Sequence, residues 1–152
     1  MRKVLAGTLI CILAFLFTSV GAVSAKAHEP KSFGCDQVII FDTINSDHWV
    51  GTLSGCDLAG KVEYWETDQN YVVGKTEHFF ETFTITPNAG GVINGVDAGV
   101  WNFSTFKFRA NGWVTDATGP WTALVGYKFH EMGTTTSPDL PVIYGPSTIS
   151  LH

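Results

Sequence analysis

Basic residues are scarce in this sequence, and their scarcity limits the partners that it can have. Only nine of the 152 residues are Lys or Arg, against 14 Asp and Glu. From residue 26 onward there are seven basic and 14 acidic residues, a formal net charge of −7. Nucleic acids and anionic lipid surfaces both attract proteins through a basic surface, so we expect neither as a partner.

The sequence also lacks the short motifs of common catalytic and cofactor sites. There is no Gly-rich phosphate loop followed by Lys-Ser or Lys-Thr, no Gly-x-Ser-x-Gly elbow and no His-Glu-x-x-His. The five histidines are widely spread, so a metal site would need a constellation assembled by the fold. We therefore expect no cofactor and no metal, and an enzymatic role is not the leading hypothesis.

Residues 1–25 have the three parts of a secretory signal peptide. Arg2 and Lys3 form a positive start, an apolar stretch follows, and small residues end the segment. The alternative is an N-terminal membrane anchor, but the apolar run is short for a full span. We expect a mature domain of residues 26–152 that is secreted or periplasmic and keeps no stable membrane span.

Cleavage is compatible with the small residues at two points, after Ala25 or after Ala27. The second would leave His28 at the N-terminus, where an amine and an imidazole together can bind copper, but no paired His motif supports such a site. Cys11 lies inside the apolar stretch and follows the bulky Ile10, which argues against a lipoprotein anchor. We assign Cys11 no function.

The mature chain keeps two cysteines, Cys35 and Cys56. An even pair in an exported domain predicts a disulfide, either between neighbouring antiparallel strands or between a strand and a following turn. A loop of about 20 residues closed in this way contributes roughly 3 kcal/mol in the chain-entropy model. The alternative, a two-Cys metal site, needs two more ligands at short spacing, and only His48 is near.

Short β-rich segments separated by Gly, Asn-Gly and Pro turns make up the mature chain, with no clear helix pattern. We expect turns at 87–91, Asn94-Gly95, Asn111-Gly112 and 116–120. The expected strands are residues 38–41, 48–53, 61–67, 71–86 (one strand, or two with a bend at Gly74), 99–109, a partner starting at 113–115, 121–132 and 142–151.

Regular spacing of about eight strands predicts an all-β fold, either a single antiparallel barrel or a β-sandwich. Along 121–132, Trp121, Tyr127 and Phe129 would share one face with Ala123 and Val125, and the other face mixes polar and apolar residues. A sandwich usually keeps one face cleanly polar. Mixed faces favour the barrel, whose outer wall can pack on another subunit, so a homo-oligomer is a further expectation.

Two histidines are the candidates for acid–base chemistry. His78 lies within Glu77-His78-Phe79-Phe80-Glu81, and His130 directly precedes Glu131. A His that faces the lumen can act as a general base near neutral pH. The alternative for both is an exposed or structural His on a strand, and Arg109 is similarly interpreted as an exposed residue.

Aromatic side chains are the candidates for a ligand site, because they offer large, rigid contact area. Most of the five tryptophans are expected to pack the barrel. We select Trp65, Phe80, Trp101 and Tyr127 as the residues that line a pocket.

The stretch GVWNFSTFKFRANGWVTDATGPW at 99–121, which runs on to His130-Glu131-Met132-Gly133, resembles small exported β-barrels grouped with allene oxide cyclase and dirigent proteins. Those proteins share an Ala-Thr-Gly turn between two late strands. The resemblance implies an eight-stranded antiparallel barrel, often oligomeric, with a cavity for apolar small molecules. None of that family's catalytic residues can be placed here. Residues 121–126 are also similar to a late strand of avidin-type barrels, although the early biotin-binding motif is missing.

Three functional hypotheses follow. The first is an exported barrel that binds a small apolar or aromatic molecule in its lumen. The second is a structural or interaction protein of the cell exterior with a filled core. The third is a cofactor-free cyclase or isomerase in which His78 or His130 works with a neighbouring carboxylate.

Overall fold

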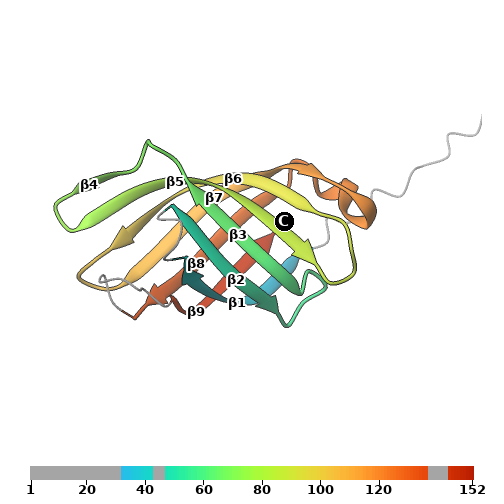
Figure 1. The fold of residues 1–152 in the computed structure, drawn as a ribbon, viewed down its shortest axis with the longest axis horizontal. Coiled ribbons are helices and arrows are strands. Elements are labelled where there is room, and N and C mark those ends of the chain that lie inside the picture. The colour runs from blue at the N-terminus through green and yellow to red at the C-terminus, as the bar shows by residue number, and fades with distance from the viewer. Residues whose placement is uncertain (1–31, 43–46, 137–143) are drawn as a thin grey trace, which may run out of the picture.

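A computed structural model describes residues 32–42, 47–136 and 144–152 (Figure 1). The predicted leader, Cys11 and both cleavage points lie outside these residues. Among the described residues, no helix is long and apolar enough to cross a membrane. The elements are β1 (Phe33–Phe41), β2 (His48–Ser54), β3 (Gly60–Glu66), β4 (Tyr71–Val73), β5 (Thr76–Pro87), β6 (Ile93–Asn102), β7 (Lys107–Ala117), the 3₁₀ helix η1 (Gly119–Leu124), β8 (Lys128–Thr135) and β9 (Tyr144–Leu151).

The sheet closes into an eight-stranded antiparallel barrel, as the spacing of the strands predicted. Neighbouring strands follow the order β3-β2-β1-β9-β8-β7-β6-β5, and β3 pairs with β5 to close the ring. Tyr64 lies opposite Phe83 at this closure. The sandwich alternative is therefore wrong. The short strand β4 pairs only with β5 and forms a hairpin that projects beyond one end of the barrel (Figure 1).

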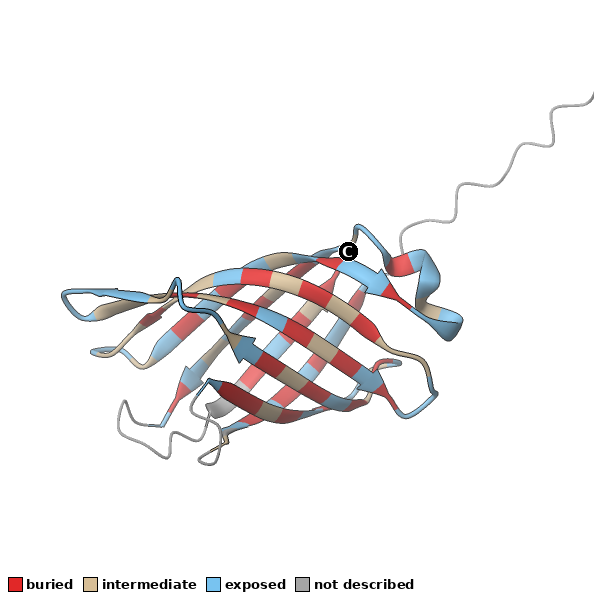
Figure 2. Cartoon of the chain, turned by 45° about the horizontal axis from the view of Figure 1, so that its top comes forward, coloured by how far each residue is buried: buried red, intermediate tan, exposed pale blue. Residues whose placement is uncertain are grey.

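Alternation along the strands places large apolar side chains inside the barrel. Figure 2 shows buried residues recurring at every second position of the wall strands. The rings of Phe83 on β5 and Phe129 on β8 stack with centroids 4.2 Å apart, so aromatic rings from opposite parts of the wall meet in the core. At the end away from β4, Leu124 of η1 is buried. The ring of Trp121 meets that of Phe33 edge-on, with ring centroids 6.3 Å apart. This end of the barrel is closed.

The predicted disulfide joins Cys35 to Cys56. Their sulfur atoms are bonded and their Cα atoms are 5.1 Å apart. Cys35 lies on β1, and Cys56 lies in the turn that follows the adjacent strand β2. The bond therefore fixes the β1–β2 hairpin beside the closed end.

Two turns predicted from Asn-Gly pairs were wrong, because these glycines lie inside strands. Gly95 lies in β6 and Gly112 in β7. A Cβ on Gly95 would lie 2.1 Å from the Phe83 ring, and one on Gly112 would lie 2.5 Å from the Cβ of Asp97. Both glycines make room for a neighbour's side chain in the lumen, rather than for a reversal of the chain.

The strand predicted over 99–109 contains the real reversal. β6 ends at Asn102 and β7 begins at Lys107. The Asn102 side-chain oxygen accepts hydrogen bonds from the backbone N–H groups of Ser104 and Thr105, at 3.0 and 2.9 Å. Asn in this role competes with strand pairing, and Phe106 completes the turn with a φ of 58°.

The strand predicted over 121–132 was also wrong in its first half. Gly119–Leu124 forms η1 instead, and β8 starts at Lys128. Proline at the first turn of a helix supplies a suitable φ and lacks only an N–H that would go unpaired there, so Pro120 favours the helix. The face that would have joined Trp121 to Tyr127 and Phe129 does not exist.

Candidate functional site in the barrel lumen

Three carboxylic side chains meet inside the barrel. Glu81 on β5, Asp97 on β6 and Glu131 on β8 are 7%, 5% and 2% exposed. Each offers an oxygen, and these oxygens all lie within 4.8 Å of one another. The alternation of side chains along a strand places them inside the barrel. On β5, for example, Glu81 lies between the inward-facing Phe79 and Phe83 in the same every-second-residue register. Glu81 is also directly opposite Asp97 in the β5–β6 pairing. We call these three residues the carboxyl cluster.

Neighbouring polar groups orient Glu131. The Gln37 side-chain amide donates to its carboxyl and also, at 3.2 Å, to the hydroxyl of Ser147. The Tyr64 hydroxyl donates to the Gln37 side-chain oxygen at 2.7 Å. All four residues are buried. A hydrogen-bonded network from four strands therefore fixes one member of the cluster.

Asp97 is the least satisfied member of the cluster. Among the described residues, only the carboxyl of Glu81, when it is protonated, can donate a hydrogen bond to Asp97. Neither carboxyl oxygen of Asp97 has another donor there. Gly112 on β7 leaves the space that Asp97 occupies. Burying an ionised carboxyl without a partner is costly, so Asp97 must share a proton or face a cation.

Among the described residues, no basic side chain is buried beside the cluster to offset its charge. Burial is the main cause that raises the pKa of Glu131 to about 7, against hydrogen bonds from Gln37 and Tyr64 that favour the ionised form. Burial, followed by the charges of neighbouring carboxyls, raises the pKa of Glu81 and of Asp97 well above the ordinary range. In the part of the chain that the structure describes, the Lys and Arg residues are all exposed: Lys61, Lys75, Lys107, Arg109 and Lys128.

A narrow pocket is lined by two members of the cluster, Glu81 and Glu131, and by residues near the barrel end from which the β4–β5 hairpin projects (Figure 1). Two further carboxyls lie in it, those of Glu66 at the end of β3 and Glu77 near the start of β5. Glu66 accepts from the indole N–H of Trp49 at 2.6 Å and from Asn70 at 2.9 Å. Burial raises the pKa of both Glu66 and Glu77. We call this opening the acidic mouth.

Aromatic rings form most of the remaining wall of the acidic mouth. The space that the centre of a water molecule can reach there is about 10 Å³, roughly the room for one water molecule. The pocket therefore admits a small head group, not a whole drug-sized molecule. Its aromatic lining consists of Trp49, Tyr64, Phe79, Trp101 and Phe108.

Of the four aromatic residues selected from the sequence, only Trp101 lines this pocket. It is 7% exposed, and its indole N–H donates to Thr135 at 3.1 Å. The ring of Trp65 stacks on that of His48 with centroids 3.7 Å apart, and Trp65 is 44% exposed. Phe80 lies on the face of β5 opposite Phe79 and Glu81 and is half-buried, while Tyr127 lies in the turn between η1 and β8 and packs against the core.

Neither candidate histidine faces the lumen. His78 lies on the outer face of β5, and its ring stacks on that of Tyr71 with centroids 4.6 Å apart. His130 lies on the outer face of β8, with its Nδ1 2.9 Å from the side-chain oxygen of Asn111. The cyclase hypothesis required one of them in an enclosed cavity, and neither His78 nor His130 lies in the lumen pocket.

The sequence held a signal for the carboxyl cluster that motif reasoning missed. Glu81 and Glu131 occupy the inward register of strands whose other inward residues include Phe79, Phe83 and Phe129. An acidic residue in the apolar phase of an alternating strand is expected inside the barrel. Asp97 lacked even this signal, because Gly95 and Gly99 flank it in the same register.

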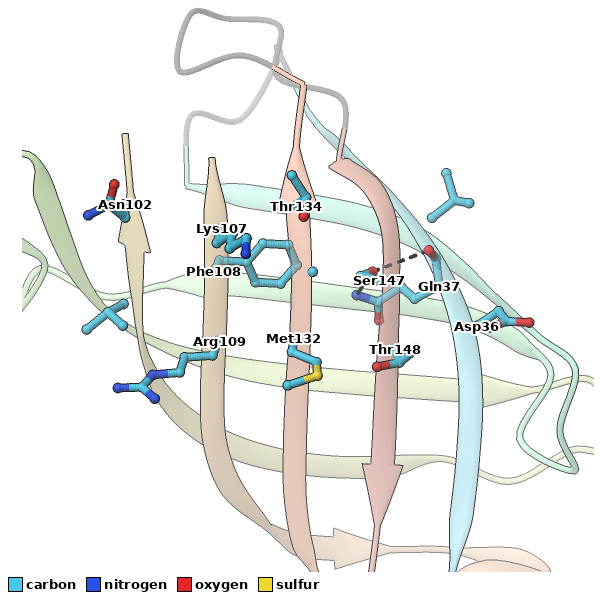
Figure 3. Close-up of a pocket in the computed structure, with 13 residues that line it drawn as sticks. Asp36, Gln37, Asn102, Lys107, Phe108, Arg109, Met132, Thr134, Ser147 and Thr148 are labelled. Carbon is cyan, nitrogen blue, oxygen red and sulfur yellow. Dashed lines mark hydrogen bonds between the residues drawn. The ribbon is translucent and has the colours of Figure 1, made fainter. Parts of the chain in front are cut away.

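A second hollow lies on the outer wall (Figure 3). It has a volume of about 870 Å³ and spans β6, β7, β8, β9 and β1. Arg109, Met132, Thr148 and Asp36 are successive partners across four of these strands. Met132 is 49% exposed and Val38 is 54% exposed. This groove is a partly apolar surface, and its lining also includes the buried polar side chains of Gln37 and Ser147, which are hydrogen-bonded to each other.

Comparison with known proteins adds no homologue. No family model, curated protein or solved structure matches this chain. The lumen itself therefore carries the functional argument.

Proposed function

We propose that this protein binds a small organic cation, an ammonium group attached to an apolar or aromatic body. The observation that carries the proposal is the lining of the acidic mouth, where Glu66 and Glu77 lie among aromatic rings and lead to the carboxyl cluster. A cation gains from carboxylates through charge-assisted hydrogen bonds and from ring faces through cation–π attraction.

This proposal narrows the ligand class expected from the sequence. A wholly apolar molecule would leave several buried carboxyls without partners, which is unfavourable. The inner space suits an ammonium head of about the size of a water molecule, with the rest of the ligand outside. Glu77 is the primary partner, because it is half-buried at the mouth and no side chain in the described part of the chain hydrogen-bonds to its carboxyl, whereas Trp49 and Asn70 already bind Glu66.

The compartment is part of the same proposal. A disulfide persists in oxidising environments, and the Cys35–Cys56 bond together with the predicted leader supports a secreted or periplasmic protein. A homo-oligomer stays a prediction. The outer groove with Val38 and Met132 is the face that would carry it, because exposed apolar patches of this kind mark protein contacts.

Tryptophan fluorescence tests the ligand class, since Trp49 and Trp101 line the mouth. We expect saturable binding of benzylammonium near neutral pH and much weaker binding of benzyl alcohol and benzoate. Loss of one charge-assisted hydrogen bond costs about 1.5–3 kcal/mol, so Glu77→Gln should weaken benzylammonium binding roughly tenfold or more. The matched control is Glu63→Gln on the outer face of β3, which should leave binding unchanged.

Two outcomes would contradict the proposal. Equal affinity for benzylammonium and benzyl alcohol would favour a neutral apolar ligand. No saturable signal with a panel of primary, secondary and quaternary ammonium ions would favour a structural role for the filled barrel.

A further inference from the structure

The carboxyl cluster has the composition of a site for a hard metal ion. Glu81, Asp97 and Glu131 come from three different strands, and their ligand atoms converge within 4.8 Å in the barrel interior. We propose that the cluster binds one divalent cation of the calcium type. The proposal concerns the buried floor of the lumen. Glu81 and Glu131 also line the acidic mouth, but the metal site depends on Asp97, whereas ammonium binding depends on Glu77.

Asp97 provides the observation that distinguishes this cluster from an ordinary group of acidic residues. Its carboxyl is 5% exposed and points into the cluster, and neither of its oxygens has a donor among the described residues other than a proton on Glu81. Buried polar groups in native proteins are normally paired. A cation between the carboxyls would satisfy the free oxygens of Asp97 and offset the cluster's negative charge in one step.

The surroundings of Asp97 keep it in this position. Gly112 on the adjacent strand β7 leaves no side chain to displace it, since a Cβ there would lie 1.9 Å from the Val96 carbonyl oxygen and 2.5 Å from the Asp97 Cβ. Asp97 is also directly opposite Glu81 on β5. The backbone therefore brings the two carboxyls together independently of any hydrogen bond between them.

The donor atoms select the class of metal. All three residues offer carboxylate oxygens, which are the ligands of hard cations such as Ca²⁺, Mg²⁺ and Mn²⁺. No His or Cys belongs to the cluster, which disfavours zinc and copper. Ligands of a calcium ion at about 2.3–2.6 Å lie at most roughly 5.2 Å apart, and the cluster's oxygens, all within 4.8 Å of one another, can therefore reach one such ion. Mg²⁺ loses its bound water reluctantly and demands near-ideal octahedral geometry.

Gln37 and Tyr64 would act as the supporting groups of this site. Gln37 donates to Glu131, and the hydroxyl of Tyr64 donates to the Gln37 oxygen. Hydrogen bonds of this kind orient carboxylate ligands and preserve the geometry of a metal site. The competing occupant of the cluster is a pair of protons shared among the three carboxyls, and the experiment must separate protons from metal.

Thermal unfolding at pH 7.5 distinguishes protons from metal in the cluster. The disulfide-bonded chain is first freed of metal with a chelator. With CaCl₂ at a hundred times its dissociation constant, we expect the midpoint temperature of unfolding to rise by roughly 5 °C or more. Mn²⁺ should give a similar rise and Mg²⁺ a smaller one. Asp97→Asn should abolish the rise, whereas Glu77→Gln at the acidic mouth should retain it.

The results that overturn the proposal are distinct from those that overturn ammonium binding. An unchanged midpoint with all three ions, or an equal rise in Asp97→Asn, would assign the cluster to shared protons. Equilibrium dialysis of the unmodified chain with Ca²⁺ gives a second readout if the variant fails to fold: one ion per chain supports the site, and none contradicts it. Benzylammonium binding depends on Glu77 and stays measurable in either case.

Discussion

Glu81 and Asp97 lie directly opposite each other on β5 and β6, with both carboxyls buried in the lumen. All Lys and Arg residues within the described ranges are exposed, so none of them is buried beside this pair. Like charges opposite each other across a sheet are destabilising, and burial increases the cost. The pair is therefore tolerated only because protons or a cation neutralise it. The stability of the barrel should reflect which of these is present.

Metal-free protein should lose stability as pH rises. The pKa of Glu131 is raised by burial from 4.5 to about 7, and burial also raises the pKa values of Glu81 and Asp97 well above the ordinary range. A carboxyl whose pKa is higher in the folded state stabilises the fold fully at pH values below its unfolded pKa, and this contribution is lost as pH rises through the folded pKa. We expect the urea midpoint, measured with chelator present, to fall from pH 5 to pH 8.

The control for this pH dependence is Glu131→Gln, which removes one titrating group and should make the fall between pH 5 and pH 8 smaller. Added Ca²⁺ should also reduce the loss at pH 8 if the metal proposal holds. A midpoint that increases steadily over this range would contradict the view that the cluster is protonated in the metal-free fold.

Replacement of Gly112 by Ala should destabilise the barrel. The new Cβ would lie 1.9 Å from the Val96 carbonyl oxygen, so backbone must shift. Overpacking of this kind costs about 1–3 kcal/mol. The matched control is Gly34→Ala on β1, where nothing lies within 4 Å of the added atom. Chemical denaturation should show a clear loss for the first variant and little change for the second, and equal midpoints would contradict the packing role of Gly112.

Reduction of the Cys35–Cys56 bond should lower the free energy of unfolding. The bond closes a loop with a sequence separation of 21 residues, for which the chain-entropy model gives roughly 3 kcal/mol. Urea unfolding with and without a reductant measures this difference. Cys35→Ala with Cys56→Ala should reproduce the reduced midpoint without a reductant. Identical midpoints for the oxidised and reduced chains would show that the bond is not a major support of the fold.

Alternation and turn residues were enough to predict the barrel and the turns at Gly74 and 87–91, but the turns predicted at the two Asn-Gly pairs were wrong. Asn111-Gly112 has the composition of a two-residue hairpin, yet Gly112 lies in mid-strand, where β6 approaches so closely that a Cβ would meet the Val96 carbonyl oxygen and Asp97. Asn102, in contrast, ends β6 through side-chain bonds to the next backbone N–H groups. The local sequence indicates where a turn is possible. Whether the chain turns there depends on packing between neighbouring strands.

The lumen was harder to predict for a related reason. Trp101, one of the residues selected from the sequence, lines the acidic mouth, and its role in ligand binding stays a prediction. The carboxyl cluster depends on the register between β5, β6 and β8, which brings together residues up to 50 positions apart. Spacing along the chain contains no such information. The two histidines were selected because a His side chain can act as an acid or a base. The alternation along each strand, however, places His78 on the face of β5 that does not contain Phe79, and His130 on the face of β8 that does not contain Glu131.

Gln37→Met should move the pH at which the metal-free fold loses stability. The Gln37 amide donates to Glu131 and holds the pKa of that carboxyl below the value that burial alone would impose. Without this donor the pKa of Glu131 rises, so its protonated form persists to higher pH, and the midpoint of the stability loss should shift upward. Asn111→Met, which removes an amide from the outer wall near His130, should leave that midpoint in place. A downward shift in Gln37→Met, or the same shift in both variants, would show that Gln37 does not control the ionisation of Glu131.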